Sequence, residues 1–76
     1  MFTVAALYKF TPFGSPEAIQ GPLAKACCEH GVKGTLLLAR EGINGTIAGT
    51  PEGISAALAH IKSLPGCRDI EWKEST

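Results

Sequence analysis

The stretch Gly34–Gly49 decides the fold, and it reads Gly-Thr-Leu-Leu-Leu-Ala-Arg-Glu-Gly-Ile-Asn-Gly-Thr-Ile-Ala-Gly. The apolar run from Leu36 to Ala39 is too short for a helix and is typical of a buried strand. Isoleucine and threonine favour a second strand from Ile43 to Ala48. Because a charged pair followed by glycine lies between the two segments, at residues 40–42, we predict a β-hairpin in the middle of the chain.

The turn of this hairpin has two possible positions. Asn44-Gly45 is the strongest two-residue hairpin signal, because both central residues of a type I′ turn need positive φ. A turn there would leave only residues 46–48 as the return strand. A turn at Glu41-Gly42 leaves a strand of ordinary length. We favour the second position and expect Asn44-Gly45 to form a bulge or a close backbone approach inside the strand.

The flanking segments predict two further strands. Residues 2–10 are apolar at both parities, which indicates a strand that is covered on both faces or central in a sheet. Residues 69–74 alternate between polar and apolar, which predicts a half-exposed strand with Ile70 and Trp72 facing inward.

Two helices are predicted by a repeated start signal. Ser15-Pro16-Glu17 and Thr50-Pro51-Glu52 each combine a capping residue, a proline suited to the first helical position and an acid at the positive end of the dipole. The apolar stripe of the first helix contains Ile19, Leu23, Ala26, Cys27 and His30, and that of the second contains Ile54, Ala57, Leu58, Ile61 and Leu64. Pro22 either kinks the first helix or divides it into a single turn and a helix from Pro22 to His30. The continuous stripe favours the kink, and Gly31 is well placed to end the helix.

The resulting order is strand, helix, strand, strand, helix, strand. Two similar halves of this kind predict an α+β ferredoxin-like βαββαβ sandwich, with an antiparallel four-stranded sheet and two helices on one face. In that topology the first and third strands are central. We expect residues 1–76 to form a single domain of this type, which acylphosphatases share.

Composition excludes several classes of protein. Seven basic and seven acidic side chains cancel, so net charge indicates neither a nucleic-acid nor a membrane partner. The chain has no long apolar run and no charged-then-apolar leader, so we expect a soluble, unexported protein. Three cysteines, with Cys27 and Cys28 adjacent, are most simply reduced thiols in a cytosolic protein.

Few residues of the sequence suggest a catalytic, binding or metal-ligating role. Arg40, Glu41 and Asn44 could grip a phosphate or a base edge, although turns collect such residues without any function. No Cys–His arrangement and no metal-ligand spacing is evident around Cys28, Cys67, His30 or His60, so we expect inert thiols, no metal and no cofactor. The loop at residues 11–14 lacks the arginine of acylphosphatases and the C-x-x-C of metal chaperones.

Aromatic side chains leave an RNA-recognition interpretation open. Tyr8 and Phe10 share a parity on the first strand, and Trp72 lies on the last. They could stack bases on an open sheet face, or they could equally face the helices or a second domain.

The segment Ala39–Thr46 resembles the A-x-E-G-I-N-G-T core of the N-terminal domain of rhodanese-containing tRNA uridine hydroxylases, and similarity to that family spans nearly the whole chain. The resemblance implies a cytoplasmic accessory domain that contributes tRNA binding or positions a rhodanese domain in cis, with the catalytic rhodanese domain absent from this chain. The family is tRNA-modifying and oxidative, and this piece is expected to be inactive alone. Its candidate RNA-binding or docking residues are Arg40, Glu41, Gly42, Ile43, Asn44 and Gly45. The alternatives are a free-standing small-ligand or acylphosphatase-like domain, or a structural or dimerising module.

Overall fold

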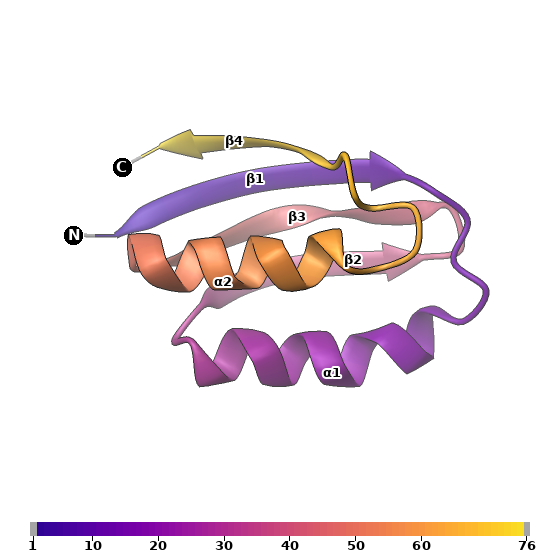
Figure 1. Ribbon diagram of the computed structural model, residues 1–76, viewed down its shortest axis with the longest axis horizontal. Helices are drawn as coiled ribbons and strands as arrows, with labels where there is room; N and C mark the ends of the chain where they lie inside the picture. Colours follow the sequence, from indigo (N-terminus) through magenta and orange to yellow (C-terminus); the bar gives the residue numbers. More distant parts are fainter. Residues whose placement is uncertain (1, 76) are drawn as a thin grey trace.

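The computed structural model describes residues 2–75 and contains the six predicted elements in the predicted order (Figure 1). Their bounds are β1 (Thr3–Phe10), α1 (Pro16–Glu29), β2 (Lys33–Ala39), β3 (Gly42–Gly49), α2 (Pro51–Lys62) and β4 (Glu71–Ser75). The last strand therefore begins two residues later than the alternation of residues 69–74 predicted.

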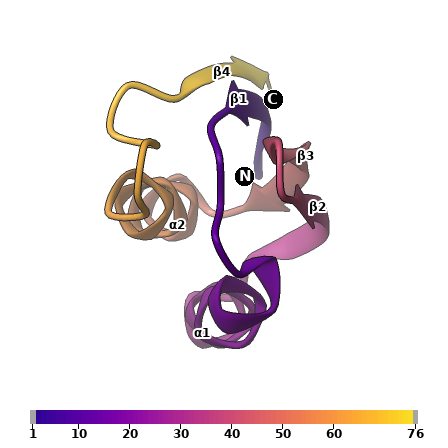
Figure 2. The same cartoon turned by 90° about the vertical axis from the view of Figure 1, so that its right-hand side faces the viewer.

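The four strands form one antiparallel sheet in the order β2-β3-β1-β4. Both helices lie on the same side of it (Figure 2), with α2 packed on β1 and β3, and α1 packed on β2 and on α2. The ferredoxin-like prediction is confirmed, and β1 and β3 are the central strands. The first strand is central, and the helices cover only one of its two apolar faces.

The hairpin turn lies one residue earlier than predicted. Ala39 pairs with Gly42, so Arg40 and Glu41 form the two-residue turn and Gly42 is already part of β3. At Asn44-Gly45 the register continues without interruption, so there is no bulge. Gly45 has a φ of 152°, and a Cβ there would overlap the carbonyl oxygen of Thr35. The close backbone approach is therefore the correct alternative, and it explains the glycine.

Helix α1 runs through Pro22 as one helix. The carbonyl of Ala18, which Pro22 leaves without its helical donor, belongs to an exposed residue where water can satisfy it. Ser15 occupies the cap position, but its hydroxyl donates to the Glu17 carboxylate at 3.4 Å and makes no capping bond to the backbone. Thr50 does cap α2, because its Oγ1 accepts from the Gly53 N–H at 3.1 Å.

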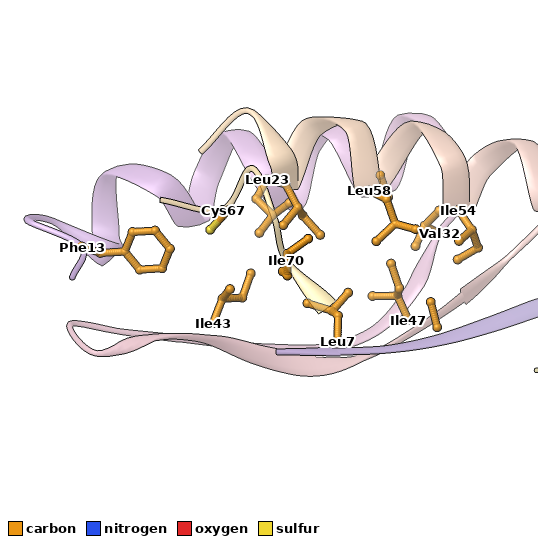
Figure 3. Close-up of a cluster of buried hydrophobic side chains, with 13 residues drawn as sticks. Leu7, Phe13, Leu23, Val32, Ile43, Ile47, Ile54, Leu58, Cys67 and Ile70 are labelled. Carbon is orange, nitrogen blue, oxygen red and sulfur yellow. The ribbon is translucent and has the colours of Figure 1, made fainter. Parts of the chain in front are cut away.

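The core lies between the sheet and the two helices (Figure 3). Its buried side chains are Ala5, Leu7, Phe13, Leu23, Val32, Ile43, Ile47, Ile54, Ala57, Leu58, Ile61, Cys67 and Ile70. The stripe of α2 is almost entirely buried, whereas α1 buries only Leu23 and leaves His30 exposed. The prediction that His30 belongs to an apolar stripe was wrong, because the helix ends at Glu29 and His30 is its C-cap.

The side of the sheet that Trp72 faces is decided by the register of β4. Trp72 pairs with buried Leu7 and therefore points to the helix side. There the Lys62 ammonium of α2 lies 4.3 Å from the centroid of the indole ring. The prediction that Ile70 and Trp72 face inward is confirmed for both, although Ile70 precedes the strand and Trp72 stays partly exposed.

Candidate functional site

One face of the sheet carries no helix and presents large apolar side chains to solvent. Phe10 is 75% exposed, Leu37 is 60% exposed and Tyr8 is 50% exposed. We call this surface the open face. Its principal side chains are Tyr8 and Phe10 of β1, Asn44 of β3, Leu37 of β2, and Glu71 and Lys73 of β4. Apolar exposure of this kind on a small domain is typical of an interaction surface.

Strand register places four of these residues in one row across the sheet. Leu37 is paired with Asn44, Asn44 with Tyr8, and Tyr8 with Glu71. Paired residues in an antiparallel sheet lie about 4.5–5.5 Å apart on the same face. An amide, a phenol and a carboxylate are therefore neighbours in the middle of the open face, with an apolar side chain at its β2 edge.

A hollow of about 230 Å³ lies beside the aromatic pair and is lined by Tyr8, Lys9, Phe10, Asp69 and Glu71. The two rings meet edge to face, with their centroids 5.6 Å apart and their planes at 86°, which is a favoured aromatic geometry. At its rim the Lys9 ammonium lies 3.0 Å from the Asp69 carboxylate. The hydrogen bond from Lys9 holds the pKa of the Asp69 carboxyl below its ordinary value.

The predicted site residues at the hairpin do not act as one group. Ile43 is buried in the core, and Gly42 and Gly45 are at positions where a Cβ would overlap a neighbouring carbonyl. Arg40 and Glu41 are exposed at the turn, while Asn44 is exposed on the open face. The structure thus separates the motif into three structural residues and three that a partner could reach.

The hairpin turn is anchored to the loop that follows β1. The backbone N–H of Thr11 donates to the Glu41 carbonyl at 2.9 Å, and that of Phe13 donates to the Arg40 carbonyl at 3.0 Å. These bonds hold the turn against the loop at residues 11–14. They also occupy the N–H groups of Thr11 and Phe13, so neither of these two is free to bind an anion.

The three cysteines differ in burial and in their position in the fold. Cys67 is fully buried and Cys28 is exposed, while Cys27 is partly buried. Burial raises the pKa of the Cys67 and Cys27 thiols, which makes them less nucleophilic at neutral pH. Cys27 and Cys28 border a largely apolar groove of about 380 Å³ between α1 and β2. Cys27, which the sequence places on the apolar stripe of the first helix, is thus only partly buried against the core.

The histidines do not assemble a site. His60 is half-buried, and its Nε2 has no hydrogen-bond partner within residues 2–75. Within residues 2–75 no group of three His, Cys, Asp or Glu side chains could hold a metal ion. In the same range no helix is long and apolar enough to cross a membrane.

Sequence reasoning missed Leu37 and Glu71. Leu37 stands in an apolar run that predicts a buried strand, but the register turns it to the opposite face from Leu36 and Leu38. The place of Glu71 on the open face could not be predicted, because it depends on the residue of β1 with which Glu71 pairs. The alternation of Tyr8 and Phe10 was visible, and the structure places both on the open face while it places Trp72 on the other.

The fold and the open face together define an acylphosphatase-like domain of the ferredoxin-like class. A family model described as "UPF0176 acylphosphatase like domain" matches residues 2–76, and the chain belongs to this family.

Curated relatives confirm the resemblance found in the sequence, and each is named "tRNA uridine(34) hydroxylase". The protein of Caulobacter vibrioides (strain NA1000 / CB15N) is 70% identical over 69 residues, which cover 91% of this chain and 22% of the relative. That of Jannaschia sp. (strain CCS1) is 60% identical over 76 residues, covering 100% of this chain and 25% of the relative. That of Gluconobacter oxydans (strain 621H) is 61% identical over 72 residues, covering 95% and 23%. The chain thus spans about a quarter of the length of these relatives.

Proposed function

We propose that this chain is an accessory domain of a tRNA uridine hydroxylase, which holds the tRNA or positions the catalytic domain and does no chemistry itself. Support comes from the relatives, which share up to 70% of the residues matched and are about four times longer. In this proposal a rhodanese domain in cis carries the catalysis, and the enzyme works in the cytoplasm, where it modifies tRNA. The 76 residues form one domain of that enzyme.

The observation that carries the proposal is the open face. A sheet with one solvated face normally presents polar side chains there, yet this one presents Tyr8, Phe10 and Leu37. Covering those side chains with a partner would remove apolar surface from water, which is favourable by roughly 25 cal/mol per Å². The open face is therefore the surface through which we propose that the domain acts.

Acylphosphatase activity of this chain is an alternative function that the structure supports less well. The loop at residues 11–14 has no arginine, and the N–H groups of Thr11 and Phe13 are already bonded to the hairpin turn. The loop therefore supplies no guanidinium of its own, and two of its N–H groups are not free to bind a phosphate. Hydrolysis of an acyl phosphate by the isolated chain would revive this alternative.

Within the accessory role, the hairpin residues divide by exposure. Arg40 at the turn is suited to a phosphate contact, and Asn44 on the open face is suited to a hydrogen bond with a base edge or a partner's backbone. Glu41 shares the turn with Arg40. The other three residues contribute only by shaping strand β3, and they are Gly42, Ile43 and Gly45.

The proposal can be tested in a chimera of the Jannaschia relative in which this chain replaces the matched 76 residues. We expect the chimera to hydroxylate uridine 34 of tRNA and the isolated chain to show no turnover. Replacing Tyr8 and Phe10 together by serine should lower the chimera's rate by tenfold or more. The matched control is Lys25→Ala, at an exposed position of α1. Wild-type rates with the serine variant, or turnover by the chain alone, would refute the proposal.

A second experiment separates RNA contact from domain docking. Amide shifts of the isolated chain are mapped during titration with a tRNA anticodon stem-loop at low salt, where phosphate contacts are strongest. Shifts at residues 40–46 and on the open face would indicate direct RNA contact. If those amides do not move, direct RNA contact is wrong and the domain acts by docking.

A further inference from the structure

We propose that the hollow beside Tyr8 and Phe10 receives an arginine side chain, so that the open face docks on an apolar protein surface that presents a guanidinium. The inference rests on the proposed function, because it takes the open face as the working surface of an accessory domain. It adds to that function the kind of surface that the partner presents to the open face. The rest of the longer polypeptide is the expected source, since the matched segment is only 25% of the Jannaschia relative.

The hollow has the geometry that a guanidinium requires. The rings of Tyr8 and Phe10 stand edge to face with centroids 5.6 Å apart, and both are at least half exposed. Glu71 is the cross-strand partner of Tyr8, so the two residues lie one strand spacing apart on the open face. Aromatic faces with a carboxylate beside them are the groups that bind a guanidinium, through stacking and charge-assisted hydrogen bonds.

The charged residues that line the hollow favour a cation. The lining has one cation, Lys9, and two anions, Asp69 and Glu71. Lys9 is bonded to Asp69 at 3.0 Å, and Glu71 makes no salt bridge within residues 2–75, so the lining carries one more negative than positive charge. Lys73 lies on the same face but one row away, opposite Ala6. The hollow therefore favours a cation and disfavours a phosphate.

The surroundings of the hollow suit a protein partner better than RNA. RNA-binding sheets need a basic surround, because phosphate neutralisation supplies most of their affinity. This chain as a whole has no net charge, the single cation that lines the hollow is bonded to Asp69, and the exposed residue that completes the row is apolar Leu37. An apolar surface with one cationic anchor is the usual composition of a protein interface, in which arginine is enriched.

The test is a titration of the isolated chain, followed by amide shifts, with three probes. L-argininamide presents the guanidinium, L-citrullinamide is its neutral isostere, and hexauridylate represents single-stranded RNA. We expect argininamide to shift the amides of Tyr8, Phe10 and Glu71 in a saturable way. Citrullinamide should bind at least threefold more weakly, and hexauridylate should leave these amides unmoved.

The variant Glu71→Gln separates the two kinds of partner, because it changes their affinities in opposite directions. If an arginine is the ligand, the variant weakens argininamide binding by roughly two- to fivefold. If RNA is the ligand, removing a negative charge strengthens hexauridylate binding. The control is Glu29→Gln at the end of α1, which should change neither.

Two results would overturn the inference. One is equal binding of argininamide and citrullinamide, or no shift with either at Tyr8 and Glu71. The other is saturable hexauridylate binding at these residues that Glu71→Gln strengthens. The amide spectrum of each variant reports directly whether the chain is still folded. The proposed function survives either result, because it is decided by the activity of the chimera.

Discussion

Gly45 and Thr35 approach more closely than any side chain at position 45 would allow. A Cβ on Gly45 would overlap the Thr35 carbonyl oxygen and would lie 2.8 Å from the Cα of Leu36. Gly45 also has a φ of 152°, which L residues rarely adopt. The glycine that looked like part of a turn signal is thus required by the pairing of β2 with β3.

The substitution Gly45→Ala should destabilise the domain by about 2 kcal/mol or more, because it adds backbone strain and a clash with the neighbouring strand. The measurement is the urea midpoint of unfolding. The control is Gly14→Ala, where a Cβ would meet nothing within 4 Å. If the two variants have the same midpoint, the close approach does not constrain position 45.

Alanine substitutions at two neighbouring residues of the hairpin motif should have different effects on the stability of the domain. Ile43→Ala removes a side chain that is 2% exposed, and we expect a loss of about 2–5 kcal/mol in the free energy of unfolding. Asn44→Ala changes an exposed side chain and should cost less than about 0.5 kcal/mol. In the chimera, Asn44→Ala should nevertheless lower hydroxylation. A stability loss at Asn44 as large as that at Ile43 would contradict the separation of structural from exposed motif residues.

The contact between Lys62 and Trp72 should contribute to the attachment of β4. Lys62→Met keeps the aliphatic stem and removes the charge that lies 4.3 Å from the ring centroid. We expect a loss of about 0.5–1 kcal/mol and a change in tryptophan fluorescence of the folded state. Lys25→Met on α1 serves as the control. Unchanged stability and fluorescence in Lys62→Met would show that the contact is not populated.

Stability should fall in acid partly through Asp69. Its carboxyl has a lowered pKa in the folded chain, chiefly because Lys9 donates to it. A lowered folded pKa gives stability that is present above the unfolded value of about 3.9 and is lost as the pH falls through the folded value. Asp69→Asn should therefore lower Tm at pH 7 but not at about pH 2. Equal differences in Tm at both pH values would rule out this linkage.

The three thiols should react in the order of their exposure. With iodoacetamide at pH 8, Cys28 should be alkylated first and Cys27 more slowly, because burial raises the pKa of the Cys27 thiol. Cys67 is fully buried and should react only when urea unfolds the chain. Peptide mapping by mass spectrometry gives the order, and Cys28→Ser should remove the fast phase. Early labelling of Cys67 would show that the end of the core near Phe13 opens readily.

Much of the fold could be predicted because local signals agree with it. The Pro-Glu helix starts, the apolar stripe of α2 and the glycines of the hairpin each indicate the element in which they are found. The errors occur where two residues compete for one role, as at the turn, which uses Arg40-Glu41 in place of Glu41-Gly42. Ser15 is a similar case, because its hydroxyl bonds to Glu17 and not to the helix backbone.

The candidate site was less predictable. The motif Arg40–Gly45 was visible as a unit, but its six residues serve different purposes once Ile43 is buried and Asn44 is exposed. The row that joins Leu37, Asn44, Tyr8 and Glu71 contains residues from four separate strands. No local pattern in the sequence can indicate such a row.

By itself, the sequence determined the order of strands and helices and the family, because these depend on periodicity, caps and glycines that act over a few neighbouring residues. Only the tertiary structure decided which side chains meet and which face stays open. A strand's alternation defines two faces but does not say which one the helices cover. That choice is made by strand register and by the packing of α1 and α2 on one side of the sheet, and it leaves Tyr8 and Phe10 in water while Trp72 lies against Lys62.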